Sequence, residues 1–366
     1  MKRVASWLAG LCAVAALAVC PAWAEAGEKG DKKKLVFIAG GRSHAYGQHA
    51  FKAGCELLKK RMDAAYGDKL VTELYTDNWP KDTSVLDSAD AIVIYCDGGA
   101  NHPVNKHLDQ IDRLAKKGVG IAMMHYGVET VKGKSGDLFL DWIGGYFEMN
   151  WSVNPHWRNL NSELAKDHPM TRGVKAYSTQ DEWYYHMRFP PEMKGVTAIL
   201  SALPPKETLS RPDGPHSGNP FVREAVAKGE KQVLAWARER ADGGRGFGFT
   251  GGHFHWTWGN DDNRKMILNG LAWITKLDVP ENGVQSKRPD LAELRENQDW
   301  PVPEKFDFAK IEKELNDQGF QPACCGCYLS APSRPPYPVG AGCFSVRCHR
   351  PTPSRRRRPT GSTCTR

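Results

Sequence analysis

Turns that combine glycine with histidine or aspartate follow four short apolar runs of the sequence, at residues 40–44, 97–102, 125–127 and 251–255. Glycine lets the backbone approach a ligand closely, and imidazole groups act as acids, bases or metal ligands near neutral pH. Such turns are typical of a ligand site, in which His44 and His125 are the first candidates for proton transfer. A histidine held only by hydrogen bonds in a tight turn is the alternative for each.

Two further histidines, His253 and His255, stand two residues apart in the last of these turns. On an extended segment their side chains would face the same way, and with His44 or His125 they could chelate a divalent, zinc-like metal. The spacing fixes no third ligand. A site without a cofactor and a site with a metal therefore both stay open.

Apolar runs alternate with amphipathic stretches, which is the pattern of strands connected by helices into a largely parallel sheet. The spacing of apolar residues predicts helices over 51–65 and 104–115, and a third is expected over 261–276. The predicted strands lie at 35–39, 71–75, 91–95, 119–124, 197–200, 232–237 and 246–250. The expected fold class is α/β, with a mostly parallel sheet and helices on both faces. Ligands bind outside the carboxyl ends of such strands, where the four turns would meet.

The two ends of the chain differ in composition from its middle. Residues 1–24 join two basic residues to an apolar run, which predicts a secretory signal peptide cleaved near Ala24 and a secreted or periplasmic protein. The run is too short for a stable membrane span. Residues 323–366 hold eight arginines and six cysteines without a hydrophobic period, which predicts a disordered tail.

A single domain is expected over 32–277, followed by an extended strap or linker, rich in proline and charge, over 278–322. The formal net charge of +8 comes from the ends of the chain. The eight arginines of residues 323–366 and the two basic residues of the predicted signal together carry more positive charge than the net charge of the whole chain. The charge therefore does not indicate a nucleic-acid partner, and neither glycine-rich nucleotide motif occurs. Cys55 and Cys96, the two cysteines of the domain, are expected in the core.

Motifs spread over residues 33–276 together resemble the ThuA-like family, which is named for trehalose utilisation. They are the 40–44 turn with His49 behind it, the 125–127 turn, Gly144-Gly145-x-Phe147, His168-Pro169-x-Thr171-x-Gly173, Asp181-Glu182-x-Tyr184, Gly252-His253 and Asn269-Gly270-x-x-Trp273. The resemblance implies a flavodoxin-like fold related to the class I glutamine amidotransferases. It also implies a role in the bacterial catabolism of disaccharides through 3-keto sugars.

The fold relationship draws attention to His125. In the amidotransferases a nucleophilic cysteine occupies the strand-to-helix turn two residues before a glycine, and here His125 stands there with Gly127 after it. An acyl-enzyme route would lack its nucleophile, so glutamine hydrolysis is not expected. Asp181 and Glu182 could serve as acid, base or ligand, and salt bridges to arginines are the open alternative for both.

Aromatic residues outside helical spacing favour a sugar ligand, because flat apolar faces stack on sugar rings. They are Trp151, Trp157, Trp183, Tyr184, Tyr185, Trp256 and Trp258, and core positions are their alternative. The expected catalytic residues are His44, His125, Asp181 and Glu182. The expected substrate-binding residues are Gly41, Arg42, Ser43, Asp97, Tyr126, Trp151, Tyr184, His253 and Trp256.

Three classes of function follow from this reasoning. The first is a carbohydrate-active hydrolase, lyase or isomerase that processes a glycoside or 3-keto-glycoside by histidine and carboxylate acid–base chemistry, with or without a metal. The second is a non-catalytic sugar-binding module. The third is an amidase or peptidase, which the missing nucleophile disfavours. A small-molecule carbohydrate is the expected partner, and no oligomeric state is predicted.

Overall fold

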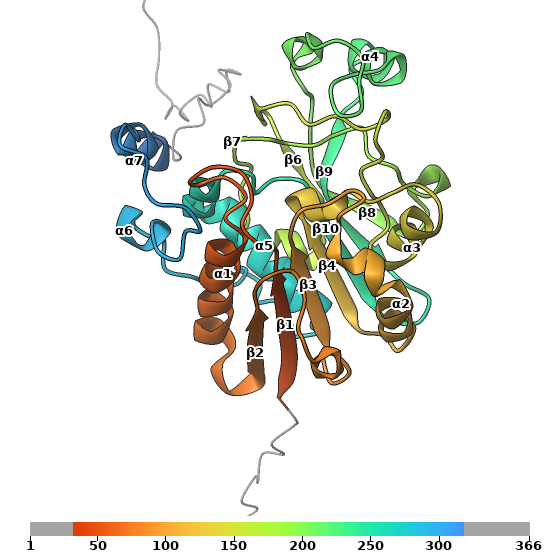
Figure 1. Cartoon of the computed structure of the whole chain (residues 1–366), viewed down its shortest axis with the longest axis vertical. Helices are drawn as coiled ribbons and strands as arrows, with labels where there is room; N and C mark the ends of the chain where they lie inside the picture. Colours follow the sequence, from red (N-terminus) through yellow and green to blue (C-terminus); the bar gives the residue numbers. More distant parts are fainter. Residues whose placement is uncertain (1–31, 318–366) are drawn as a thin grey trace, which may run out of the picture. The chain divides into compact units, whose positions relative to one another are not determined.

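The structure is a computed structural model that describes residues 32–317. Within this range, eight strands form one sheet with helices on both of its faces (Figure 1). The strands are β1 Lys33–Ala39, β2 Leu70–Tyr75, β3 Ala91–Tyr95, β4 Gly120–Met124, β6 Glu163–Leu164, β8 Val196–Ala202, β9 Gln232–Glu239 and β10 Arg245–Phe249, while β5 Trp157–Arg158 pairs with β7 Gln180–Asp181. The helices are α1 Phe51–Tyr66, α2 Leu108–Lys116, α3 Lys134–Trp142, α4 Pro220–Ala227, α5 Asp261–Ile274, α6 Leu291–Leu294 and α7 Phe308–Asp317. The predicted α/β class is confirmed.

The sheet has the strand order β2-β1-β3-β4-β10-β9-β8-β6. The first five strands in this order run parallel, and the last three extend the sheet by antiparallel pairing. β3 and β4 are buried along their whole length, as strands covered on both faces must be. The carboxyl ends of β1, β3, β4 and β10 consequently meet at one rim.

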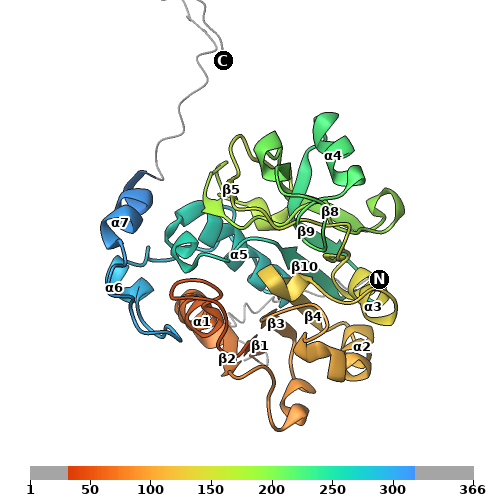
Figure 2. The same ribbon diagram turned by 45° about the horizontal axis from the view of Figure 1, so that its top comes forward.

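Alternate residues of the central strands pack on opposite faces of the sheet. Leu35 and Phe37 of β1 belong to the core that contains α1 and α5, whereas Val36 and Ile38 belong to the core that contains α2 and α3. Figure 2 shows these two pairs of helices on either side of the sheet. Because burying one such side chain contributes about 1.5–3 kcal/mol, the two apolar layers hold the rim and its turns in place.

The helix predicted over 104–115 is interrupted in the structure. A 3-10 helix, η3 Pro103–Lys106, comes first, and α2 begins at Leu108. Nδ1 of His102 accepts a hydrogen bond from the backbone N–H of Val104 at 3.1 Å and so caps η3. Cys55 and Cys96 are both buried, as expected.

Most of the aromatic residues predicted at a sugar-binding rim lie in the core instead. Trp157, Trp183, Tyr185 and Trp258 belong to the main hydrophobic cluster. Trp183 packs edge-on against Phe249 of β10, with ring centroids 5.5 Å apart. Irregular segments also supply core residues, so an aromatic residue outside helical spacing need not be exposed.

The segment predicted as an extended strap contains α6 and α7 in its described part, residues 278–317. Glu293 of α6 accepts two hydrogen bonds from the guanidinium group of Arg61 on α1, at 2.9 and 2.6 Å. Trp300 donates from Nε1 to the carbonyl oxygen of Ser43 at 2.7 Å, and the guanidinium group of Arg42 lies 3.9 Å from its ring centroid. This segment is therefore held against α1 and against the turn after β1.

The predicted signal peptide at 1–24 and the predicted tail at 323–366 lie outside the described residues. In residues 32–317, no helix has the length and hydrophobicity that a membrane crossing requires.

Candidate metal centre at the carboxyl rim of the sheet

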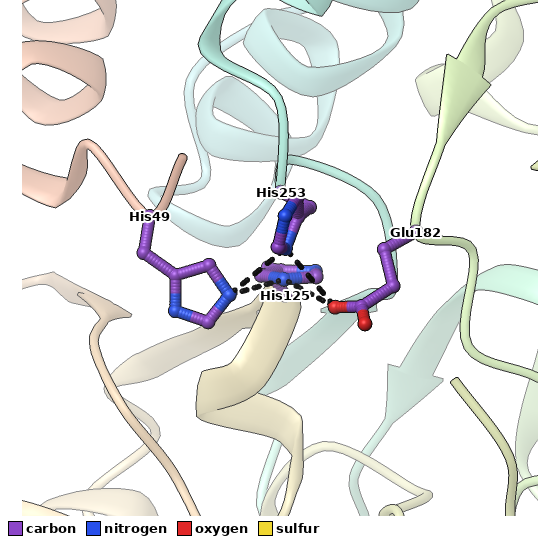
Figure 3. A group of neighbouring side chains, drawn as sticks. All are labelled: His49, His125, Glu182 and His253. Atoms are coloured by element: carbon purple, nitrogen blue, oxygen red, sulfur yellow. Dashed lines mark hydrogen bonds and ion pairs between the residues drawn. The ribbon is translucent and has the colours of Figure 1, made fainter. Parts of the chain in front are cut away.

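Four buried side chains converge at the rim: His49, His125, Glu182 and His253, called the donor group below (Figure 3). The three histidines follow β1, β4 and β10, whose parallel direction brings their carboxyl ends together, and Glu182 follows β7. One ligand atom from each residue lies within 4.8 Å of the others. Of the four, His125, Glu182 and His253 were predicted as site residues from the sequence.

The atoms of the donor group are close enough to share one cation. Nε2 of His49 lies 3.0 Å from Nε2 of His125 and 3.0 Å from Nδ1 of His253. Oε2 of Glu182 lies 3.0 Å from Nδ1 of His253 and 3.5 Å from Nε2 of His125. A tetrahedral metal with bonds of about 2.0–2.1 Å separates its ligand atoms by about 3.3–3.4 Å. The donor group therefore has nearly the dimensions of a four-coordinate site.

Neighbouring acceptors fix the tautomers of two of the rings. Nδ1–H of His125 donates to the carbonyl oxygen of Thr250 at 2.9 Å, and Nδ1–H of His49 donates to Oδ1 of Asp97 at 3.1 Å. Because these oxygens only accept, the proton of each neutral ring is on Nδ1 and the lone pair is on Nε2. The Nε2 lone pairs of His49 and His125 therefore face each other. Two lone pairs at 3.0 Å repel each other unless a cation lies between them. A carbonyl or carboxylate behind each ligating imidazole is also the usual second layer of a metal site.

The electrostatics favour a metal ion over a proton in this position. Burial, together with the neighbouring imidazole of His125, lowers the pKa of His49. Burial also lowers the pKa of His253. Burial acts to raise the pKa of Glu182, but hydrogen bonds with His125, His156 and His253 outweigh it and hold that pKa well below its usual range. Metal ligands must be neutral imidazoles and ionised carboxylates, and these shifts maintain those forms.

The backbone at the site is held in the left-handed region. His125 has φ +50° and His49 has φ +45°, a conformation that is uncommon outside glycine and is typical of functional turns. His125 begins the 3-10 helix η4 His125–Val128 directly after β4. The strand-to-helix turn predicted for His125 is therefore present, and it directs the imidazole into the rim.

Asp181 positions this site without joining the donor group. Its side chain is fully buried, and its oxygens accept backbone hydrogen bonds from Gly252 at 2.7 Å, Glu182 at 2.9 Å and Phe254 at 3.2 Å. Gly252 has φ +104°, and a Cβ atom there would lie 3.1 Å from the hydroxyl of Tyr95. The carboxylate thus fixes the turn that presents His253, which differs from the catalytic role predicted for Asp181.

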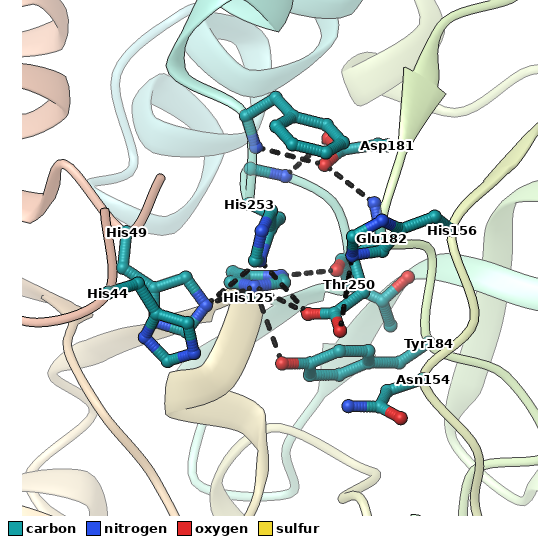
Figure 4. Close-up of polar contacts among 12 residues, drawn as sticks. His44, His49, His125, Asn154, His156, Asp181, Glu182, Tyr184, Thr250 and His253 are labelled. Carbon is teal, nitrogen blue, oxygen red and sulfur yellow. Dashed lines mark hydrogen bonds and ion pairs between the residues drawn. The ribbon is translucent and has the colours of Figure 1, made fainter. Parts of the chain in front are cut away.

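Two accessible histidines flank the donor group (Figure 4). His44 lies with its ring centroid 3.5 Å from that of His49, and Nε2 of His156 lies 3.6 Å from Oε1 of Glu182. Burial lowers the pKa of His44, whereas the hydrogen bond with Glu182 raises the pKa of His156. The flanking rings therefore differ in their affinity for a proton.

A hydrogen-bonded relay connects His44 to the carboxylate behind His49. The hydroxyl of Ser43 donates to Oδ1 of Asp97 at 2.9 Å, so Nδ1–H of His44 donates to the hydroxyl oxygen at 2.7 Å. Nε2 of His44 then has a free lone pair. The predicted residues Ser43, His44 and Asp97 are thus brought together at one edge of the donor group.

Several other predicted residues have different surroundings. Tyr184 lies in the site, with its hydroxyl 3.3 Å from Nε2 of His125, and the ring centroid of Tyr126 lies 5.7 Å from that of His49. Trp151 is instead stacked on His186 at 4.3 Å. Gly41 donates its backbone N–H to Asn78 at 3.0 Å. The guanidinium group of Arg42 lies over the ring of Trp300, and the ring centroid of Trp256 lies 5.9 Å from that of Tyr46.

The structure corrects the expectation that His253 and His255 face the same way. His255 begins the 3-10 helix η8 His255–Gly259 and is buried outside the donor group. Burial lowers its pKa to about 3. The ligand role proposed for His255 is wrong because the chain leaves the extended conformation directly after Phe254.

Sequence reasoning missed two of the histidines at the site. His49 was noted only as part of a motif, because it lies ten residues beyond the end of a predicted strand in an irregular loop. His156 is not among the residues that the sequence predicts for the site; it is exposed, and its ring contacts Glu182. The Asp181-Glu182 pair was the signal for His156, since a buried carboxylate requires a partner.

Comparison with protein families matches residues 35–274 to the ThuA family, described as trehalose utilisation. The chain belongs to the ThuA family. Solved structures that are similar to it include two ThuA-like proteins. A ThuA-like protein from Bacteroides uniformis ATCC 8492 has 19% identity and a TM-score of 0.46, with 66% of this chain and 91% of that chain covered. One from Parabacteroides merdae ATCC 43184 has 14% identity and a TM-score of 0.44, with 70% and 93% covered. No curated protein compared with the chain matches it.

Proposed function

We propose that this ThuA-family chain is an exported, metal-dependent enzyme of carbohydrate breakdown that acts on a glycoside or its 3-keto derivative. The observation that carries the proposal is the convergence of three imidazoles and one carboxylate. In two of the imidazoles, those of His49 and His125, Nδ1 donates a hydrogen bond to a neighbouring oxygen. Three nitrogen ligands and one oxygen suit zinc or a similar divalent ion. Such an ion would polarise a substrate oxygen and make a bound water more acidic.

The residues around the donor group supply the proton transfers of such a reaction. His44 is exposed, and the relay through Ser43 to Asp97 leaves its Nε2 free to accept a proton. His156 approaches from the other side and has the carboxylate of Glu182 to stabilise its charged form. One flanking group is thus arranged to take a proton and the other to give one, which is the division of roles that acid–base catalysis requires.

The family supports a sugar as the substrate, because its description is trehalose utilisation. A 3-keto sugar has a carbonyl group whose oxygen a divalent ion polarises, and it has an acidic neighbouring C–H bond. The donor group with its flanking histidines suits the removal or return of that proton. Residues 1–24, outside the described range, have the composition of a signal peptide, which is the basis for including export in the proposal.

The main alternative is a sugar-binding module in which the same histidines only donate hydrogen bonds. Amidase or peptidase chemistry of the cysteine type is not favoured, because Cys96 is buried at the end of β3 with its Sγ 3.7 Å from Nε2 of His102. Burial raises its pKa well above the usual thiol range. In residues 32–317, the other cysteine, Cys55, lies on α1 with its side chain buried in the core.

The experiment is a turnover assay on trehalose and on 3-keto-trehalose, with the full chain loaded with Zn²⁺ or Mn²⁺ and after chelation. We expect metal-dependent conversion of one of the two sugars, with a loss of at least about 100-fold in Glu182→Gln. His107→Gln is the matched control, because His107 stacks on Trp79 away from the donor group. Binding of sugar without conversion, equal in the loaded and chelated protein, would establish the sugar-binding module instead.

A further inference from the structure

A cavity of about 250 Å³ lies between α7 and the body of the domain. One wall is formed by α7 and the preceding residues, including Phe306 and Ile311. The opposite wall comes from the loop after β1, the residues around β7 and the start of η8, including Trp256. The volume is below the roughly 300–1,000 Å³ of sites for drug-sized ligands, and it suits a single small ring.

Aromatic side chains form much of the lining. The ring centroids of Tyr46 and Phe306 lie 5.0 Å apart, edge to face, and those of Tyr46 and Trp256 lie 5.9 Å apart. Phe254 completes this part of the wall. Flat aromatic faces are the surfaces on which the apolar faces of sugar rings pack.

One buried hydroxyl group of the lining forms no hydrogen bond. It is Oγ1 of Thr179, in a residue that is 3% exposed. Nearly all buried polar atoms in proteins have a partner, so an unpaired hydroxyl at a cavity favours a ligand that supplies the partner. Arg158, Gln180 and Glu314 add further polar groups to the same lining. The cavity thus offers aromatic faces together with hydrogen-bonding groups, as a neutral polyhydroxy ring requires.

The cavity and the donor group are built from the same segments of chain. Gln48 and Phe254 line the cavity and pair as an isolated antiparallel bridge. Their sequence neighbours His49 and His253 are members of the donor group. The cavity and the donor group therefore lie on either side of residues that are neighbours in the chain.

We propose that this cavity binds one pyranose ring, the ring of a glycoside that does not react, against Trp256 and by a hydrogen bond to Thr179. The description of this ring as part of a substrate rests on the proposed function. Binding of the ring itself does not depend on a metal or on turnover.

Thr179→Val is the most direct test, because it removes an unpaired hydroxyl and keeps the shape of the side chain. Since the hydroxyl has no partner in the free protein, we expect its removal to leave the melting temperature unchanged or higher. Titration of the full chain with methyl α-D-glucopyranoside, followed by ligand-observed NMR, should show saturable binding that Thr179→Val weakens roughly five- to tenfold.

Thr179→Ser keeps the hydroxyl and should bind like the wild type. Sorbitol, which has the hydroxyls but no ring, should bind much more weakly. Glu182→Gln should bind the glucoside normally, so a failure of the donor group as a metal site is distinguishable from a failure of the cavity. Absence of saturable binding, or equal affinity in Thr179→Val and the wild type, would overturn the proposal and identify the cavity as a packing gap beside α7.

Discussion

Replacing Asp181 with asparagine should destabilise the protein and weaken metal binding together. The carboxylate accepts three backbone hydrogen bonds at a position with no solvent exposure, two through Oδ1 and one through Oδ2. An asparagine can keep its oxygen toward Glu182 and Phe254, which directs its NH2 group at the N–H of Gly252. One charge-assisted bond is then lost, and two donors face each other.

The expected loss of stability follows from these contacts. A hydrogen bond to a charged group contributes about 1.5–3 kcal/mol, and a buried donor left without a partner costs about 1–3 kcal/mol. Burial raises the pKa of Asp181, so the wild-type carboxylate already has a desolvation cost that asparagine avoids. We therefore expect the free energy of unfolding to fall by about 2–4 kcal/mol.

Urea unfolding measures this change, and titration with Zn²⁺ measures the effect on the site. Because Gly252 and Phe254 flank His253, we expect the affinity for Zn²⁺ to fall by about 10–100-fold, as for other residues that orient ligands. Asp109→Asn is the control, since Asp109 is an exposed partner of Lys134 and its replacement should leave the free energy of unfolding close to that of the wild type. A free energy of unfolding within about 1 kcal/mol of wild type, with unchanged affinity, would refute this role for Asp181.

Two further predictions concern buried groups away from the donor group. His102 is neutral in the fold, donating from Nε2 to the carbonyl of Gly127 and accepting from Val104, and burial lowers its pKa to about 4. Because the unfolded chain takes up this proton near pH 6.5, roughly 3 kcal/mol of stability is lost as the pH falls from about 6.5 to about 4. Urea unfolding at several pH values should show a shallower acid loss in His102→Asn, and an identical loss would exclude this cause. Alkylation of the native protein by iodoacetamide should leave its metal content unchanged, since Cys55 and Cys96 are buried with raised pKa values; metal lost in step with modification of either residue would contradict this.

The fold could be predicted from the sequence because burial on both faces leaves a strong pattern. The run 91–95 is entirely apolar and forms β3, and the apolar stripe from Phe51 to Met62 forms one face of α1. The interruption at His107, between η3 and α2, could not be predicted in this way, because η3 is capped by a hydrogen bond from the backbone N–H of Val104 to the side chain of His102. Periodicity records which side of an element is buried, but it does not record local capping.

The candidate site could be predicted only where a side chain directly follows a strand. His125 follows β4 immediately, and its position at the rim is set by the strand itself. His49 lies in a long irregular loop, and its place beside His125 depends on the path of that loop, which no spacing encodes. His255 was wrongly included because the sequence does not show that the extended segment turns into η8. Trp183 shows the same limit, since its loop folds inward onto Phe249.

The most direct test of the central claim is the metal content of the purified full chain after reconstitution with Zn²⁺ and removal of free ion, measured by mass spectrometry. The account predicts about one ion per chain in the wild type and in His107→Gln, and far less than one in His125→Gln, His253→Gln and Glu182→Gln. Far-UV circular dichroism should show that these variants are folded. A folded wild type that retains no metal, or variants of the donor group that retain as much as the wild type, would contradict the claim that these four residues form a metal site.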